Sequence, residues 1–467
     1  MVDNMVRRTL ITRFAGGFGA LAFSAFATSE SIASQVLTAT NRSKDPLLPK
    51  SPHFPARAKR VIWLCMRGAP SHVDTFDYKP ELEAKHGKTG PGRLGRNAKL
   101  MKSKWPFLPS GQNGLWISSL FPELRKQADK ICLVRSMHTD QPAHAQAFLQ
   151  MHTGSFQFVR PSLGAWTLYG LGTENRNLPG FLSIKPQPGN GGAQNYGSAF
   201  LPAVYQGMPI GRGREPVAKS KAEYISSPLL MPSSQRQQLD FIQQLQAEEQ
   251  ARNPHIEQVS SAISSYELAF RMQTDLPKVL ELQSEAEATL SLYGIGVPKS
   301  DDFGRQCLMA RRAIEAGVRF VEVTPDVNWD QHTNLAVDLP ANCAAVDKPI
   351  AGLLEDLSQR GLLDDTLVVW AGEFGRTPTA QNGDGRDHNN KGFTVWMAGG
   401  GVHGGLSFGA TDPLGFEAVD NPVHVHDLHA TVLHLLGLDH TKLTYRYAGR
   451  DFRLTDVKGN VVKALFA

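Results

Sequence analysis

Short apolar runs recur along the chain from Pro55 onward, and segments with helical spacing lie between them. A strand that is buried on both faces is nearly continuously apolar, and alternation of such strands with helices is typical of a mostly parallel sheet covered on both faces. The pattern therefore predicts an α/β fold. The predicted strands are Val61–Met66, Ile131–Val134, Val318–Val323, Thr366–Ala371 and Phe393–Ala398.

Apolar residues at helical spacing indicate the helices between these strands. A helical insert at about residues 233–293 separates the second and third strands, and we expect it to form a cap or lid. Before it, residues 186–213 are rich in Gly, Pro and Asn, which predicts an irregular loop. The predicted helices are Glu123–Ala128, Gly304–Ala316 and Val346–Gln359 beside the strands, and Ser233–Glu249, Pro254–Gln273 and Leu276–Tyr293 in the insert, the last beginning near Pro277.

The first 33 residues are typical of an export signal of the twin-arginine type. Arg7 and Arg8 precede a moderately apolar run, Phe14–Ala27, that is too short and too rich in glycine for a spanning helix. We interpret residues 34–54 as a linker and residues 55–467 as one domain of a periplasmic or otherwise extracytoplasmic protein. The alternatives are a plain amphipathic stretch and an uncleaved anchor. No later run reaches about 18 uninterrupted apolar residues, so we expect membrane contact only through this signal.

Composition and charge exclude several classes of protein. The chain has 467 residues, and its 43 Gly and 29 Pro are too few for a collagen-like or low-complexity protein. The net charge of +5 is not organised into a long block, so we expect no nucleic-acid partner. Four cysteines without CxxC spacing indicate neither a zinc knuckle nor a disulfide scaffold. A glycine-rich basic loop between Lys85 and Lys104 is either a solvated loop or a rim that attracts an anionic substrate.

Polar and ionisable residues follow the predicted strands. In open α/β sheets, ligands bind outside the carboxyl ends of the strands. Because every strand shows the same pattern, we expect these side chains to gather at one edge of the sheet. The residues are Arg67 and Ser71 after the first strand, Arg135 and His144 after the second, Asp326, Asp330 and His332 after the third, Glu373 and Arg376 after the fourth, and Asp387 and His388 before the fifth.

Carboxylates and imidazoles together favour a divalent metal. Zinc binds His with Asp or Glu, whereas manganese and calcium take more oxygen ligands. Taken singly, an acidic residue at a strand end is more often a helix cap or an ion-pair partner, and a histidine is more often hydrogen-bonded in the core. Five such clusters at successive strand ends favour a functional pocket.

Six motifs along the chain carry a family resemblance. The chain resembles the alkaline phosphatase and sulfatase superfamily, and more narrowly the bacterial domain of unknown function 1501 family, over roughly residues 55–455. The resemblance implies an alkaline-phosphatase-like sandwich with a mostly parallel central sheet, helices on both faces and a helical insert. The motifs are RGAPSHVDTFDYKP (67–80), VRSMHTDQPAHAQAFLQMHTG (134–154), WDQHTN (329–334), GEFGRTP (372–378), GRDHNNKGFTVWMAGGGVHGG (385–405) and HDLHATVLHLLGLD (426–439).

The resemblance also implies ligands for one metal. Asp330, His332 and His388 match one superfamily metal site, and Asp326 competes with Asp330 for that role. The second site departs from the superfamily pattern. Arg67 or Gly68 and then Glu373-Phe374 stand where its Asp and Asp-His ligands are expected, and His144, nine residues before Thr153, stands at the position of the Ser, Thr or Cys nucleophile.

Two functions follow from this pattern. The first is an exported, metal-dependent hydrolase of sulfate or phosphate esters that uses one divalent metal, Zn, Mn or Ca, with one site favoured over two. Its predicted metal ligands are Asp330, His332, Glu373, Asp387 and His388, and its predicted catalytic residues are His144, Ser71 and Arg376. The expected partner is an anionic small molecule or a sulfated or phosphorylated saccharide. The second is a non-catalytic relative that binds an anionic ligand or an envelope partner.

Overall fold

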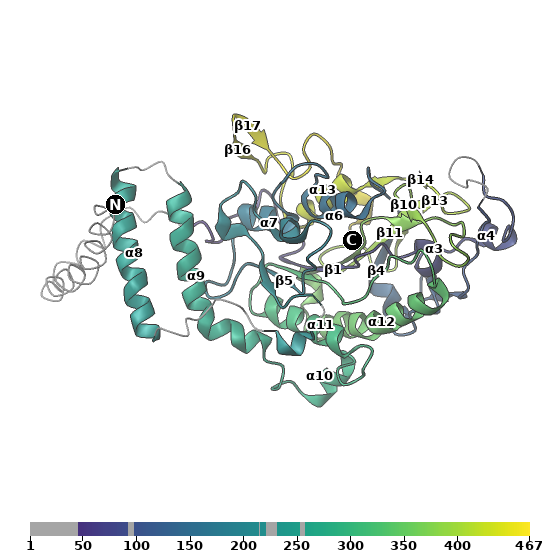
Figure 1. Ribbon diagram of the computed structural model, residues 1–467, viewed down its shortest axis with the longest axis horizontal. Coiled ribbons are helices and arrows are strands. Elements are labelled where there is room, and N and C mark those ends of the chain that lie inside the picture. Colours follow the sequence, from purple (N-terminus) through teal and green to yellow (C-terminus); the bar gives the residue numbers. More distant parts are fainter. Residues whose placement is uncertain (1–44, 92–97, 214, 221–230, 253–256) are drawn as a thin grey trace, which may run out of the picture. The chain divides into compact units, whose positions relative to one another are not determined.

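The nearly continuous apolar runs form the centre of a nine-stranded mixed sheet in the computed structural model (Figure 1). The structure describes residues 45–91, 98–213, 215–220, 231–252 and 257–467, and residues Pro46–Ala467 form one compact unit. The strand order is β12-β4-β11-β8-β1-β7-β5-β6, with β15 also paired to β4. These strands are β1 Arg60–Cys65, β4 Ile131–His138, β5 Phe181–Ile184, β6 Met208–Ile210, β7 Phe320–Val323, β8 Thr366–Ala371, β11 Phe393–Ala398, β12 Ser407–Phe408 and β15 Val423–His424.

The direction of the strands decides which loops can meet. Strand β1 is parallel to β7 and β8, and among the described strands of the nine-stranded sheet only β11 runs antiparallel to its neighbours, β4 and β8. The carboxyl ends of β1, β4, β7 and β8 therefore share one edge of the sheet, and the beginning of β11 lies at that same edge. The predicted α/β fold with a mostly parallel central sheet is confirmed.

Helices cover both faces of the sheet. In Figure 1, α6, α7 and α13 lie on one side of the central strands and α11 and α12 on the other. Helix α11 packs against both α12 and β7. The helices are α3 His72–Thr75, α4 Pro80–Ala84, α6 His144–Thr153, α7 Leu163–Leu171, α8 Pro232–Arg252, α9 Glu257–Leu280, α10 Glu287–Leu292, α11 Asp301–Glu315, α12 Leu335–Gln359 and α13 Val425–Leu435.

Short elements complete the unit around this core. Two-stranded ladders join β2 to β3, β9 to β10, β13 to β14 and β16 to β17. They are β2 Phe107–Ser110, β3 Leu115–Ser118, β9 Gly375–Arg376, β10 His388–Asn389, β13 Ala410–Thr411, β14 Ala418–Asp420, β16 Tyr445–Tyr447 and β17 Arg450–Phe452. The 3-10 helices are η1 Leu124–Lys130, η2 Gly192–Tyr196, η3 Ala203–Tyr205, η4 Val217–Lys219, η5 Leu363–Asp365 and η6 Lys463–Leu465.

Three predicted elements need correction. The segment at residues 186–213 is not entirely irregular, because Met208–Ile210 adds an edge strand whose Pro209 obscures its pattern. The segment Glu123–Ala128 is a 3-10 helix rather than an α-helix, displaced to Leu124–Lys130. The predicted helix Leu276–Tyr293 is wrong: α9 continues through Pro277 to Leu280, and α10 begins only at Glu287. A proline late in a helix loses one donor while its carbonyl still accepts, here from the N–H of Glu281.

The predicted export signal lies outside the described residues, as does the first part of the predicted linker. Among the residues that are described, no helix has the length and apolar character needed to cross a membrane.

Helix α9 of the insert packs against α8, η3 and α11. All four cysteines are free and buried.

Candidate metal centre

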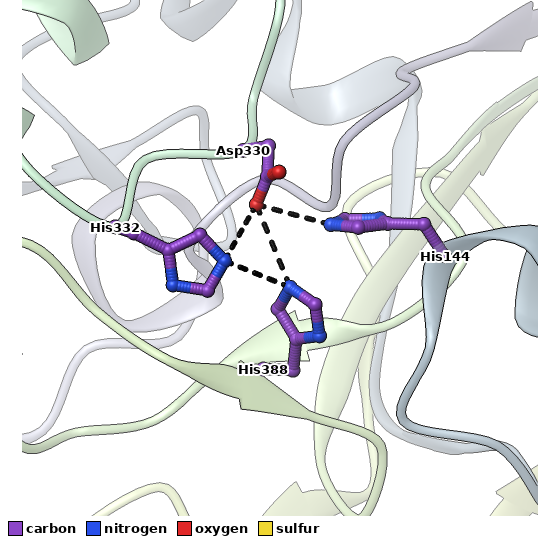
Figure 2. A group of neighbouring side chains, drawn as sticks. All are labelled: His144, Asp330, His332 and His388. Carbon is purple, nitrogen blue, oxygen red and sulfur yellow. Dashed lines mark hydrogen bonds and ion pairs between the residues drawn. The ribbon is translucent and has the colours of Figure 1, made fainter. Parts of the chain in front are cut away.

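Four side chains from three separate loops meet at the carboxyl edge of the sheet (Figure 2). His144 is the first residue of α6, Asp330 and His332 follow β7, and His388 begins β10 just before β11. We call these four residues the metal-centre cluster. One ligand atom from each lies within 4.8 Å of every other. The predicted convergence of Asp330, His332 and His388 is confirmed, and His144 joins them.

The β7–α12 loop that carries Asp330 and His332 is fixed at several points. Trp329 is fully buried, and its backbone N–H donates to the carbonyl of Arg67 at 3.2 Å. The backbone of Gly385 lies so close to His332 that a Cβ there would be 1.9 Å from the His332 carbonyl oxygen. Glycine at position 385 therefore permits the contact that brings the segment before β10 against this loop.

Distances inside the metal-centre cluster suit a bound cation. Asp330 Oδ1 lies 3.0 Å from Nε2 of His144, 3.0 Å from Nε2 of His332 and 3.5 Å from Nε2 of His388. The Nε2 atoms of His332 and His388 are 3.0 Å apart. Ligand atoms at about 2.0–2.1 Å from a tetrahedral zinc ion are roughly 3.4 Å from one another. The observed separations are close to this value, and Nε2 of His144 is buried without an aligned hydrogen bond.

Each imidazole is oriented by an acceptor behind it. Nδ1 of His144 donates to Glu373 Oε1 at 2.6 Å, Nδ1 of His332 to Gln381 Oε1 at 2.5 Å, and Nδ1 of His388 to the carbonyl of Pro142 at 2.6 Å. Such outer acceptors fix the tautomer, so that Nε2 presents its lone pair to a metal. All three rings thus present the ligating nitrogen to one point.

Glu373 lies behind the metal-centre cluster. Its carboxylate is fully buried and accepts hydrogen bonds from the Gly68 N–H, at 3.0 Å to Oε1 and 3.2 Å to Oε2, as well as from His144. The sequence predicted Glu373 as a metal ligand. In the structure its carboxylate instead accepts a hydrogen bond from Nδ1 of His144. The alternative role of an acidic residue at a strand end, a helix cap, does not apply to Glu373 either, because the following segment Gly375–Arg376 is a strand.

The guanidinium donors of Arg376 are committed to neighbouring acceptors. Nε donates to the carbonyl of Ala69, NH1 to that of Arg386, and NH2 to that of Gly68, while NH2 also lies 2.7 Å from Asp330 Oδ1. Its side chain is 1% exposed. Arg376 therefore positions Asp330 and neutralises part of its charge, and the geometry leaves it little capacity to hold a substrate anion.

Protonation in the metal-centre cluster reflects these contacts. Burial alone would lower the pKa of His144, but the Asp330 and Glu373 carboxylates raise that pKa to about 9. Burial alone would raise the pKa of Asp330, whereas its contacts with His144, His388 and Arg376 hold that pKa far below its usual range. The carboxylate of Asp330 is thus ionised at neutral pH and available to a cation.

Three residues named from the sequence lie outside the metal-centre cluster. Ser71 is fully buried, and in the described part of the chain its hydroxyl bonds Asp74 at 2.6 Å. Asp387 is 56% exposed and lies 4.0 Å from Nδ1 of His332, the nitrogen that faces away from the cluster. Asp326 lies 3.9 Å from Nζ of Lys185. The structure therefore does not bring these three into the ligand group.

Lys99 and Lys104, in the described second part of the basic loop, lie beside segments of the metal centre. The backbone N–H of Ala380 donates to the carbonyl of Lys99, next to Gln381, and Nζ of Lys104 lies 3.5 Å from Asp384. Asp384 in turn accepts from the backbone N–H of Asn334. This described part of the loop, for which the sequence left open a solvated loop or a rim, therefore contacts the segments that carry His332 and its acceptor.

Sequence reasoning missed the outer acceptors. Pro142 accepts through its backbone carbonyl, and its residue type gives no signal for such a role. The Gly68 N–H, which donates to Glu373, was missed for the same reason. Gln381 stands in a polar turn that predicts only a loop. His144 was identified by its spacing from Thr153, but as a nucleophile position rather than as a ligand.

Fold and site together define an α/β protein with a candidate single-metal centre at the carboxyl edge of its sheet. The chain belongs to the DUF1501 family, described as proteins of unknown function, whose model matches residues 58–466. This confirms the family membership expected from the sequence motifs. A comparison with curated protein sequences finds no match.

Several solved structures resemble the fold at low sequence identity. The PsFucS1 sulfatase from Pseudoalteromonas sp. is 13% identical with a TM-score of 0.38, over 88% of this chain and 72% of that one. The alkaline phosphatase from the Antarctic bacterium TAB5 is 11% identical with a TM-score of 0.32, over 83% and 99%. The C-terminal periplasmic domain of EcEptC from Escherichia coli is 10% identical with a TM-score of 0.37, over 85% and 88%. With likenesses this distant, the functional argument depends on the residues of the site itself.

Proposed function

We propose that this chain is a metal-dependent hydrolase of sulfate or phosphate esters that holds one divalent metal on His144, Asp330, His332 and His388. The observation that carries the proposal is the convergence of these four ligand atoms within 4.8 Å, with an acceptor behind the Nδ1 atom of each histidine. In histidines that only pack a core, the Nε2 atoms have no reason to point toward one common position.

The donor set favours zinc or manganese over calcium. Three imidazole nitrogens and one carboxylate suit a first-row transition metal, whereas calcium prefers six to eight oxygen ligands. Bound there, such an ion would supply Lewis-acid stabilisation of charge on the ester oxygens. We therefore narrow the expected metals to zinc and manganese, with one site.

The charges around the metal-centre cluster favour an anionic substrate. Asp330 and Glu373 contribute two negative charges, which Arg376 reduces to one, so a divalent ion would leave a net positive charge. The side chains of Asp330, His332 and His388 are 31%, 32% and 21% exposed, so a ligand can reach them from solvent. Lys99 and Lys104, in the segment that packs beside the cluster, would add to this attraction.

His144 serves this proposal as a ligand and not as a nucleophile. Its Nδ1 is committed to Glu373, and its Nε2 faces Asp330 at 3.0 Å. The hydroxyl of Ser71 is committed to Asp74. We therefore infer direct attack by water on the sulfur or phosphorus atom, with cleavage of its bond to the ester oxygen and release of an alcohol and inorganic sulfate or phosphate.

The absence of a Ser, Thr or Cys from position 144 also favours the second candidate, a metal-containing relative that binds an anionic ligand without hydrolysing it. The two candidates differ only in turnover. Both require the same metal centre, so metal content alone does not separate them.

The test combines metal analysis with turnover. Purified protein is assayed for metal by mass spectrometry and for hydrolysis of a panel of aryl sulfates and aryl phosphates, beside His332→Ala and the matched control His403→Ala, an exposed histidine. We expect one equivalent of zinc or manganese, turnover of one ester class, and loss of both in His332→Ala only. Metal without turnover supports the non-catalytic candidate, and protein that binds neither metal after reconstitution contradicts the proposal.

Export in the folded state is a separate part of the proposal, since it depends on Arg7 and Arg8 and not on the metal centre. Replacement of both by Lys should retain the protein inside the cell, because the twin-arginine pair is read as an address. Fractionation of cells that express each form measures this. Equal amounts of both forms in the envelope would contradict the signal assignment.

A further inference from the structure

A cavity lies beside α6, at the opposite end of that helix from His144. Its volume is about 200 Å³. The walls come from the end of α6 and the loop after it, from Phe200, and from the β16–β17 hairpin with the segment that follows it. We call it the aromatic–arginine pocket, because Arg160, Phe158, Phe200 and Phe452 line it.

Arg160 is the central group of this pocket. Its guanidinium lies 4.4 Å from the ring centroid of Phe452, 5.1 Å from that of Phe158 and 5.8 Å from that of Phe200. Within the described part of the chain it makes no hydrogen bond and no ion pair. Arginine carries five N–H donors, so this side chain is stacked on aromatic rings with its donors unused.

The pocket has an excess of positive charge. Four cationic side chains line it against two carboxylates, and both carboxylates already have partners. Asp140 accepts from Gln150 at 2.6 Å and lies 3.3 Å from Nε2 of His424, and Asp456 pairs with Arg450. Burial and the neighbouring Arg450 lower the pKa of Arg160. An anion placed between these guanidinium groups would relieve their repulsion.

Aromatic faces beside the cations narrow the class of ligand. Phe158 is 59% exposed and lines the pocket. An exposed ring offers an apolar surface to the C–H face of a sugar, while polar groups around it bind hydroxyls. We propose that the aromatic–arginine pocket binds an anionic saccharide, with its sulfate, phosphate or carboxylate group on Arg160 and its sugar ring against Phe158.

The pocket is close to the metal-centre cluster but separate from it. Gln150 lines the pocket and stands six residues after His144 in α6, a rise of about 9 Å along the helix. The loop between β4 and α6 contacts both places, because Asp140 lines the pocket and the Pro142 carbonyl accepts from His388. Binding in the pocket itself requires no metal.

The test is a ligand-observed NMR titration of the full chain in the presence of EDTA, so that failure of the proposed hydrolase function leaves its outcome unaffected. The probes are galactose sulfate, galactose phosphate, galacturonic acid, neutral galactose and inorganic sulfate. The variants are Arg160→Gln, Phe158→Ala and the matched control Arg176→Gln, an exposed arginine outside the pocket. Thermal unfolding of each variant verifies that it is folded.

We expect at least one anionic sugar to bind, with affinity reduced about tenfold or more in Arg160→Gln, since a charge-assisted pair is lost. Phe158→Ala should weaken binding by a smaller factor, and because Phe158 is exposed this variant should fold. Arg176→Gln should bind like the wild type. The proposal is overturned by no binding of any anionic sugar, by unchanged affinity in folded Arg160→Gln, or by inorganic sulfate binding as tightly as the sugar.

Discussion

Two groups of histidines lie near an aspartate, and within the described residues only one of them resembles a metal site. In the metal-centre cluster, three Nε2 atoms face one carboxylate oxygen, at 3.0, 3.0 and 3.5 Å. The other group, which we call the C-terminal histidine cluster, comprises His138, His424, His426 and His429. Neighbouring ring centroids there lie 5.0, 4.9 and 6.2 Å apart in chain order.

The two clusters differ in what holds each ring nitrogen. Nε2 of His426 donates to the Gly154 carbonyl and Nε2 of His429 to the Met151 carbonyl, each at 2.7 Å. Nδ1 of His424 accepts from the backbone N–H of His426 and caps α13. These nitrogens are therefore committed to local backbone groups, and no common focus forms. The number of histidines does not make a metal site, whereas outer acceptors on Nδ1 and a central carboxylate do.

Charge separates the clusters in the same way. In the metal-centre cluster, carboxylates overcome burial and raise the pKa of His144 to about 9. In the C-terminal histidine cluster, burial dominates and lowers the pKa of His424 to about 4 and that of His429 to about 3. The carboxylates of the metal-centre cluster therefore favour positive charge on His144, whereas burial favours the neutral rings of His424 and His429.

The largest expected difference between the clusters follows from removal of one histidine in each. His144→Ala should lower turnover by about 10²-fold or more and should also lower metal content, because the Nε2 ligand is lost. His138→Ala, in the C-terminal histidine cluster and outside the aromatic–arginine pocket, should leave metal content and turnover per folded molecule near wild type. Metal analysis and steady-state kinetics on both variants measure this. Turnover lost with full metal content would instead make His144 a catalytic group, and unchanged turnover would remove it from the mechanism.

A sharper comparison uses two buried carboxylates that each contact a histidine. Glu373→Gln should weaken metal affinity by about 10- to 100-fold, because an outer acceptor orients its histidine. Glu322 is the matched control, since its buried carboxylate lies 3.4 Å from Nε2 of His152, outside the metal-centre cluster. Glu322→Gln should leave metal affinity unchanged in a competitive chelator titration. Equal affinities for all three proteins would show that Glu373 does not support the metal.

The sequence predicted five central strands from their continuous apolar runs, but it missed β5, a short strand of four buried residues. Strands β8 and β11 begin and end where the pattern places them. Strand β6 was missed because three residues that include a proline, at a sheet edge, give almost no periodic signal. The break between α9 and α10 was missed because Glu285 is held there by Arg311 and Arg312, which are tertiary contacts.

In the candidate site, too, some residues could be predicted from the sequence and others depend on tertiary contacts. Asp330, His332 and His388 could be predicted because strand direction alone brings their loops to one edge. The separate roles of Glu373 and His144 could not, since both residues lie next to strand ends or helix starts and either could have been a ligand. Which of them faces the metal depends on side-chain contacts of a few ångströms, and residue type and spacing do not encode that choice.

The C-terminal histidine cluster should make the protein sensitive to acid. The pKa of His429 is about 3 in the folded protein, with burial as the main cause and repulsion by His426, His152 and His424 as a further one. In the unfolded chain its pKa is about 6.5, so below that pH the unfolded state takes up a proton that the folded state refuses. The free energy of unfolding should therefore fall as the pH falls from about 6.5 towards 3.

Urea unfolding at several pH values checks this expectation. Each such histidine contributes a slope of at most about 1.4 kcal/mol per pH unit. His429→Gln keeps a donor for the Met151 carbonyl but has no titrating ring, so its stability should fall less steeply below pH 6 or so than that of the wild type. Parallel curves for the two proteins would mean that His429 takes up its proton equally in both states.

The smallest expected effect concerns Asp387, which the sequence included among the metal ligands. Its carboxylate is 56% exposed, accepts from the His388 N–H at 2.8 Å, and lies 4.0 Å from the His332 nitrogen that faces away from the cluster. Exposed ion pairs of this kind contribute about 0–1 kcal/mol, so Asp387→Asn should change metal affinity by less than about fivefold. Asp330→Asn, which removes the charge at the centre, should lower it by far more in the same chelator titration. Comparable losses in the two variants would place Asp387 among the ligands, and would mean that the loop before β10 turns toward the metal when one is bound.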